Sequence, residues 1–122
     1  MAHILVMEDD AQFRQMLVQM LQQDGHHVDA TADGAEGMNL LRQTNPDLIV
    51  TDILMPNMDG VEAMLALSQE QRNIPIIAIS GGRRSISSSF NLESAALLGA
   101  RETLAKPFSR NDLRNAIERV LK

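Results

Sequence analysis

"DLIVTDILMPNMDG", residues 47–60, runs an apolar segment of strand length directly into an aspartate, Asp52, and then into a Met-Pro turn and a second acidic turn. The apolar residues do not alternate with polar ones, which is typical of a strand covered on both faces. Pro56 restricts Met55 to an extended conformation and turns the chain away from the strand. This stretch therefore predicts a buried strand that presents a carboxylate at its carboxyl end.

Four other segments have the length and composition of strands, and helical patterns separate them. The five expected strands cover residues 3–7, 27–31, 47–51, 75–80 and 102–105. After the first strand, and again at the end of the chain, apolar residues recur at the spacing of a one-faced helix. These residues are Phe13, Met16, Leu17, Met20 and Leu21 in the first segment, and Leu113, Ala116, Ile117, Val120 and Leu121 in the last.

Residues that begin and end helices occur where this alternation requires them. Asp10 is expected to cap the first helix. In three further places an acceptor side chain precedes an acid by three residues, which is the pattern of a capping box. The pairs are Asp33 with Glu36, Asp59 with Glu62, and Ser109 with Asp112, and Gly25 and Gly99 stand where helices should end.

Strands that alternate with helices and read as continuous apolar runs predict an α/β fold with a parallel sheet and helices on both faces. A chain of 122 residues has room for one domain, residues 1–122. Two strand orders are compatible with a doubly wound five-stranded sheet, and the flavodoxin-like order 2-1-3-4-5 suits this length. In either order, ligands bind at the carboxyl ends of the strands.

Composition excludes several classes of protein. A net charge of -5 argues against direct binding of nucleic acid, which needs clustered Lys and Arg. The absence of cysteine excludes a disulfide framework, a zinc-cysteine site and a thiol nucleophile. No apolar run approaches the roughly 20 residues that span a bilayer. We therefore expect a cytoplasmic protein with no membrane partner.

Charged and hydroxyl side chains follow the strands. Glu8 and Asp9 follow the first strand, Asp52 the third, Ser80 the fourth and Lys106 the fifth. Because the carboxyl ends of parallel strands lie at the same edge of a sheet, we expect all of these side chains to face one crevice.

Three acids at this edge require a counter-charge, since two carboxylates about 5 Å apart repel by about 3 kcal/mol at an effective dielectric near 20. A hard divalent cation with oxygen ligands provides it, and Mg²⁺ fits a site of this kind. A carboxylate beside such an ion can act as a nucleophile toward phosphorus. Lys106 and Ser80 would then each hold a phosphoryl oxygen.

The segments "ILVMEDD", "DLIVTDILMPNMDG", "IIAIS" and "AKPF" occur in this order over essentially the whole chain. In sequence and separation they resemble the receiver domain of two-component response regulators, in its stand-alone, chemotaxis-regulator-like form. The resemblance implies a phosphorylation-dependent signalling switch rather than an enzyme. It also implies a sensor histidine kinase or phosphotransfer protein as phosphoryl donor, and a downstream protein partner at the face of helix 4, strand 5 and helix 5.

The resemblance assigns a role to each matching residue. It implies that Asp52 is the phospho-acceptor, that Asp9 and Asp52 bind Mg²⁺ directly, and that Glu8 binds it through water. The main-chain carbonyl of Leu54 would complete the protein ligands.

On the phosphate side of the same site, the resemblance makes Ser80 the switch hydroxyl and Lys106 the phosphate-binding lysine. It also implies a cis peptide bond between Lys106 and Pro107. One position departs from the family pattern, because Thr103 stands where these domains often carry an aromatic residue. The usual relay from Ser80 to that aromatic residue is therefore not expected, and a different rearrangement, such as one of residues 81–91, would report phosphorylation.

Two alternative functions stay open. One is a Mg²⁺-dependent phosphohydrolase with an aspartyl-phosphate intermediate, although such enzymes generally need an acid-base residue two positions after the nucleophile, where this chain has Leu54. The other is a receiver-like scaffold that is never phosphorylated, which Thr103 would suit.

The histidines are not expected to form a metal cluster. His3 begins the first strand, whereas His26 and His27 lie at the amino end of the second. They are interpreted as surface or strand residues.

The residues two positions after Asp52 and Ser80 are Leu54 and Gly82, and neither side chain can orient a hydrolytic water. We therefore predict slow self-dephosphorylation of phospho-Asp52, and a shorter lifetime in the Leu54→Asn variant. The measurement is loss of the phosphoryl label after removal of the donor. Loss within seconds in the unmodified chain, without a phosphatase, would contradict the prediction.

Overall fold

The computed structural model describes residues 2–52, 74–80 and 100–121. Strands and helices alternate through this part of the chain. The elements are β1 (His3–Met7), α1 (Ala11–Gln23), β2 (His27–Thr31), α2 (Gly34–Thr44), β3 (Leu48–Asp52), β4 (Ile76–Ser80), β5 (Glu102–Ala105) and α5 (Arg110–Leu121). All five predicted strands are present, and β3 and β4 begin one residue later than expected.

The five strands form one parallel sheet in the order β2-β1-β3-β4-β5. The predicted flavodoxin-like order is therefore confirmed. Asp52 is the last residue of β3 and pairs in register with Ile79 of β4. Since every strand runs in the same direction, the carboxyl ends of β1, β3 and β5 lie at one edge.

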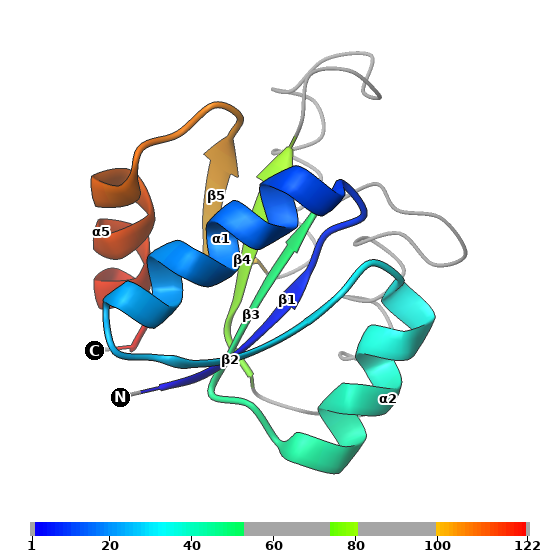
Figure 1. Ribbon diagram of the computed structural model, residues 1–122. Helices are drawn as coiled ribbons and strands as arrows, with labels where there is room; N and C mark the ends of the chain where they lie inside the picture. Colours follow the sequence, from blue (N-terminus) through cyan, green and yellow to red (C-terminus); the bar gives the residue numbers. More distant parts are fainter. Residues whose placement is uncertain (1, 53–73, 81–99, 122) are drawn as a thin grey trace.

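Helices cover both faces of the sheet. Figure 1 shows α1 and α5 on one side and α2 on the other. On the side of α1 and α5, aliphatic residues of the two helices pack with β1, β3 and β4 to form one buried cluster. Its members are Ile4, Val6, Leu17, Leu21, Leu48, Val50, Ile77, Ile79, Leu113, Ala116, Ile117 and Val120. On the side of α2, Met38 and Leu41 are buried.

The helix termini follow the predicted capping residues. Asp10 accepts hydrogen bonds from two backbone N–H groups in the first turn of α1, and Asp33 does the same for α2. At the start of α5, Ser109 and Asp112 bond each other's backbone N–H groups, both at 3.0 Å, as a capping box requires. Gly25, with φ of 90°, follows the end of α1. The capping side chains thus satisfy backbone N–H donors that a helix leaves unpaired at its start.

One expectation about the core is only partly met. Four of the five apolar residues predicted for the inner face of α5 are buried, but Leu121 is 39% exposed at the end of the helix. The Asp59 to Glu62 pair, Gly99 and residues 81–91 lie outside the described residues. No helix in the described part of the chain is long and apolar enough to cross a membrane.

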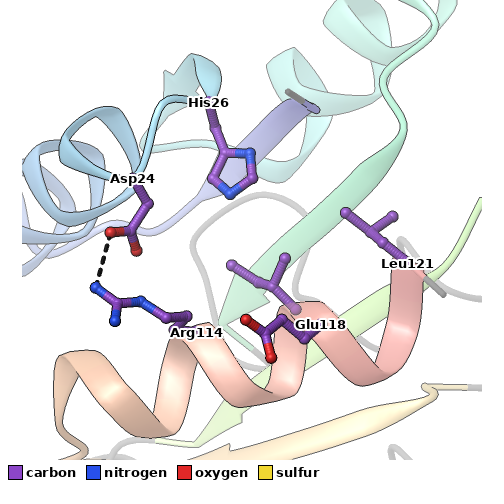
Figure 2. Close-up of a pocket in the computed structure, with 6 residues that line it drawn as sticks. Asp24, His26, Arg114, Glu118 and Leu121 are labelled. Carbon is purple, nitrogen blue, oxygen red and sulfur yellow. Dashed lines mark hydrogen bonds and ion pairs between the residues drawn. The ribbon is translucent and has the colours of Figure 1, made fainter.

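Ion pairs join the end of α1 to α5. Asp24, which follows the last residue of α1, accepts hydrogen bonds from Arg110 and from Arg114, the latter at 3.0 Å. Asp24, His26 and Arg114 line a cavity of about 290 Å³. Figure 2 shows these side chains and the contact between Asp24 and Arg114. These contacts tie the two helices that share one face of the sheet.

The histidines were not expected to form a metal cluster, but His3 and His27 lie side by side. Adjacent parallel strands place their amino ends at the same edge, and His3 of β1 is in register with His27 of β2. The two ring centroids lie 4.8 Å apart, and Asp29 lies close to both rings. The positions of these two histidines along the chain do not show that β1 and β2 bring them into register.

Gly37 lies where α2 packs closely against β1. A Cβ at this position would lie 2.2 Å from Met7 Sδ and 2.8 Å from Met7 Cγ, and Met7 is buried. We predict that Gly37→Ala lowers the free energy of unfolding by about 1–2 kcal/mol, because the overpacking outweighs the gain in helix propensity. Urea denaturation provides the measurement.

A Met7→Ala background is the control, because it removes both colliding atoms. There, Gly37→Ala should be neutral or stabilising. An equal loss in both backgrounds would show that the close approach to Met7 is not the cause.

Candidate functional site

The carboxyl edge of the sheet brings together side chains that are far apart in sequence. Glu8 and Asp9 follow β1, Asp52 ends β3, and Lys106 follows β5. One carboxylate oxygen from each of the three acids lies within 4.8 Å of the others. Glu8 and Asp52 are buried, with exposed fractions of 0% and 4%. The structure thus gathers three acids in one cluster at this edge.

Lys106 places its ammonium group among these acids. Its Nζ lies 2.7 Å from Glu8 Oε1 and 3.3 Å from Asp52 Oδ2. The lysine therefore connects the residues that follow β1 and β5 to the end of β3. Glu8 is buried and Lys106 is partly buried, so separating the pair would leave the Glu8 charge without compensation.

The loop after β1 is fixed by its own hydrogen bonds. Glu8 Oε2 accepts from the backbone N–H of Asp10 at 3.0 Å, and Arg14 Nη1 donates to the backbone oxygen of Glu8 at 2.9 Å. The backbone N–H of Glu8 donates to the oxygen of Thr31 at the end of β2. Since Asp10 also caps α1, the helix and the acidic loop position each other.

Burial raises the pKa of Glu8 to about 7, and the negative charge of Asp52 acts in the same direction, while the hydrogen bond with Lys106 opposes both. For Lys106, burial alone would lower the pKa, but the contacts with Glu8 and Asp52 outweigh it and raise the pKa above the usual value. Lys106 is therefore charged at neutral pH, whereas Glu8 titrates near neutrality.

An aromatic pair lies beside Lys106. Its Nζ lies 4.1 Å from the centroid of the Phe13 ring in α1, a cation-π geometry. Phe13 in turn meets Phe108 edge to face, with centroids 5.5 Å apart. The peptide bond between Lys106 and Pro107 is cis, as expected.

Sequence reasoning assigned Phe13 to the inner face of α1 and did not connect it with the lysine. Helical periodicity indicates which face of a helix a residue occupies, but it does not identify the neighbour across the sheet. The signal that was available is the adjacency of Phe108 to the "AKPF" segment, which places an aromatic ring two residues after Lys106.

The donor set of this cluster fits the predicted divalent cation. Glu8, Asp9 and Asp52 offer carboxylate oxygens, which Mg²⁺ prefers, within 4.8 Å of one another. The raised pKa of Glu8 has the same origin, because it reflects a buried acid beside a second one. A cation bound here would favour the ionised form of Glu8.

Two further predicted residues, Ser80 and Thr103, lie on β4 and β5, respectively. Ser80 is the last residue of β4, where its backbone is in register with Ala105 of β5. Thr103 lies on β5 opposite Ala78 and is half-buried. The carbonyl of Leu54 lies outside the described residues. The structure thus brings Glu8, Asp9, Asp52 and Lys106 together in one cluster, and the end of β4 reaches the same edge.

Comparison with known proteins gives one consistent result. The family model of the response regulator receiver domain matches residues 4–118. The chain is 36% identical over 121 residues to the response regulator receiver protein CpdR of Brucella abortus, with 99% of this chain and 98% of that protein covered. It is 34% identical over 125 residues to the transcription factor SKN7 of Saccharomyces cerevisiae, with 98% of this chain and 19% of that protein covered.

A third relative is the alkaline phosphatase synthesis transcriptional regulatory protein PhoP of Bacillus subtilis, 29% identical over 119 residues, with 98% of this chain and 48% of that protein covered. The chain thus spans about half or less of several curated relatives. Among solved structures, a response regulator receiver domain protein from Clostridium thermocellum has a TM-score of 0.89 at 26% identity, covering 99% of this chain and 94% of that one.

The pKa of Glu8 makes stability depend on pH. Between the ordinary value of 4.5 and about 7, the folded chain binds more protons at Glu8 than the unfolded chain does. The free energy of unfolding should therefore fall as the pH rises through this window, by up to about 3 kcal/mol for a shift of this size. Urea midpoints measured across this pH range without divalent cations test the slope.

Glu8→Gln should flatten that dependence, because the amide keeps an acceptor for the backbone of Asp10 and cannot ionise. The exposed Glu36, replaced by Gln, is the matched control and should leave the slope unchanged. Mg²⁺ should reduce the loss of stability at high pH in the unmodified chain. Equal slopes in the unmodified and Glu8→Gln chains would contradict the assignment.

Proposed function

Because the chain belongs to the response regulator receiver domains, we propose that it is a phosphorylation-dependent signalling switch in which Asp52 accepts the phosphoryl group. The observation that carries the proposal is the position of Lys106, whose ammonium group lies 2.7 Å from Glu8 and 3.3 Å from Asp52 in a cluster with three acids. The cluster of carboxylates suits a divalent cation, and the ammonium group beside Asp52 suits an anionic group.

The reaction that we propose uses a phosphohistidine as donor. An oxygen of the Asp52 carboxylate attacks phosphorus, so that an O–P bond forms and the P–N bond breaks. The electron pair of that bond leaves with the imidazole nitrogen of the donor, which takes up a proton. The product is an acyl phosphate on Asp52, and no oxidant or reductant is needed.

The chain's own residues orient the reacting groups and compensate their charge. Lys106 already faces Asp52, so a phosphoryl oxygen on that residue can replace a carboxylate as its partner. In this proposal Asp9 and Asp52 hold Mg²⁺ directly, Glu8 holds it through water, and the carbonyl of Leu54 completes the set. When bound, Mg²⁺ neutralises charge on the transferring group.

Ser80 is proposed as the switch hydroxyl that binds a phosphoryl oxygen. Its support is the parallel register, which ends β4 at the same edge as β3. Lys106 and Ser80 would then hold the phosphoryl group from β5 and β4, respectively.

Receiver domains interact with histidine kinases or phosphotransfer proteins, and we propose that this chain takes its phosphoryl group from one of these. We further propose that output passes through the face of helix 4, strand 5 and helix 5. Within that face, Arg119 of α5 donates to Glu102 of β5 at 2.8 and 3.0 Å. The two described elements are thus joined at the surface. A cytoplasmic location is part of the proposal.

A small phosphodonor tests the proposal directly. With acetyl phosphate and Mg²⁺, the unmodified chain should gain one phosphoryl group, measured by intact mass, and Asp52→Asn should gain none. Asp47→Asn is the matched control, because Asp47 is exposed and precedes the same strand at the opposite edge of the sheet. It should be labelled like the unmodified chain.

Two outcomes would overturn the proposal. Multiple turnover of phosphomonoesters would indicate the phosphohydrolase that the sequence left open. A folded chain that is not labelled, and that does not bind beryllofluoride in the presence of Mg²⁺, would indicate a scaffold. Neither alternative is favoured by the comparisons, which return receiver domains.

A further inference from the structure

A second group of metal-ligating side chains lies at the amino edge of the sheet, at the opposite end of β1 from Glu8. His3 and His27 are in register on adjacent strands, and Asp29 is two residues after His27, on the same face of β2. His3 Nε2 lies 2.7 Å from Asp29 Oδ2, and the two histidine rings are 4.8 Å apart and tilted by 51°. One donor atom from each residue lies within 4.8 Å of the others.

We propose that His3, His27 and Asp29 form a binding site for a transition-metal dication of the Zn²⁺ class. Two imidazoles and one carboxylate make up a three-ligand set that leaves a fourth position open to water. Imidazole nitrogen suits Zn²⁺ and its neighbours in the first transition row, whereas Mg²⁺ prefers oxygen.

The distances require small movements of side chains. In a tetrahedral zinc site with bonds of about 2.0–2.2 Å, neighbouring donor atoms are about 3.4 Å apart. The present contact between His3 and Asp29 must therefore open by about 0.7 Å, and the widest pair of donor atoms must close by about 1.4 Å at most. Rotation about side-chain bonds provides shifts of this size without a change in the sheet.

The backbone around the cluster is already fixed. The N–H of His3 donates to Asp47 Oδ2 at 2.8 Å, and the N–H of His27 donates to the oxygen of Ala2 at 3.0 Å. Parallel pairing between β1 and β2 then continues for five residue pairs. A metal ion would meet three side chains whose Cα positions are set before it binds, which reduces the ordering that binding requires.

Exposure provides an entry path. The side chains of His3 and Asp29 are 20% and 35% exposed, and His27 is exposed. An ion pair between His3 and Asp29 would explain the 2.7 Å contact by itself. It would not explain the second imidazole, whose donor atom lies within 4.8 Å of those of His3 and Asp29.

The two edges of the sheet therefore offer different donor sets. From His3 to Glu8 the chain advances by five residues, about 16 Å along an extended strand. Among the described residues, the acid group at the carboxyl edge offers oxygen donors from Glu8, Asp9 and Asp52, and the group at the amino edge offers two nitrogen donors and one oxygen. Excess Mg²⁺ should thus occupy the first site and leave the second available, so the two can be measured separately.

The test is a calorimetric titration of the folded chain with Zn²⁺ in the presence of saturating Mg²⁺. The chain carries no affinity tag. Co²⁺ serves as a spectroscopic substitute, because its visible absorption reports nitrogen ligation. We expect one equivalent to bind, and we expect His27→Gln and Asp29→Asn each to weaken binding by about tenfold or more, which corresponds to about 1.4 kcal/mol. Thermal unfolding without metal shows whether each variant is folded.

His26→Gln is the matched control. His26 precedes His27, but it lines the cavity beside Asp24 and Arg114, where Figure 2 shows its ring, and its Nδ1 accepts from the backbone of Ala2. Its replacement should change the affinity for Zn²⁺ by less than about twofold. Asp52→Asn should likewise leave the affinity unchanged.

The proposal would be overturned by the absence of Zn²⁺ binding to the folded chain. It would also be overturned by binding that His27→Gln leaves intact, or by binding that Asp52→Asn removes, since the latter would place the ion at the carboxyl edge. Phosphoryl labelling of Asp52 should be normal in His27→Gln, so this proposal and the proposed function stand or fall independently.

Discussion

The parallel direction of the strands determines where the charges of this protein gather. Glu8, Asp52 and Lys106 come from three strands that are distant in sequence, yet the common direction of β1, β3 and β5 delivers them to one cluster. Burial in that cluster makes each charge depend on the others. Without Lys106, two buried acids would face each other, and without the acids the lysine would be a half-buried cation. The chemistry proposed for Asp52 therefore rests on the architecture of the sheet as well as on local sequence.

Much of the fold could be predicted from sequence because its signals are local. Continuous apolar runs marked the buried strands, and side chains such as Asp10, Asp33 and Ser109 marked the starts of helices. Once the sheet was taken as parallel, the common edge of Glu8, Asp52 and Lys106 followed from geometry. The exposure of Leu121 did not follow, because a periodic pattern does not show where packing against the sheet ends.

Contacts across the sheet were harder to predict. Whether His3 meets His27 depends on the register of β1 with β2, and the sequence contains no local signal for that register. The contact of Lys106 with Phe13 depends on how α1 lies above the sheet, which periodicity leaves undetermined. In both cases the residue and its element were identified correctly, and the missing information was the relative position of two elements.

The surroundings of Lys106 bear on how this chain would signal with Thr103 in place of an aromatic residue. Lys106 touches Glu8 and Asp52 on one side and the Phe13 ring on the other, and Phe13 meets Phe108 at the start of the segment that leads into α5. A phosphoryl group on Asp52 would carry more negative charge than the carboxylate it replaces and would draw the ammonium group toward it. Since the same ammonium lies 4.1 Å from the Phe13 centroid, its movement would change the contact that joins α1 to the residues before α5. Under the proposed function, the aromatic pair at the lysine would link Asp52 to the residues before α5 in a domain that lacks the aromatic residue on β5.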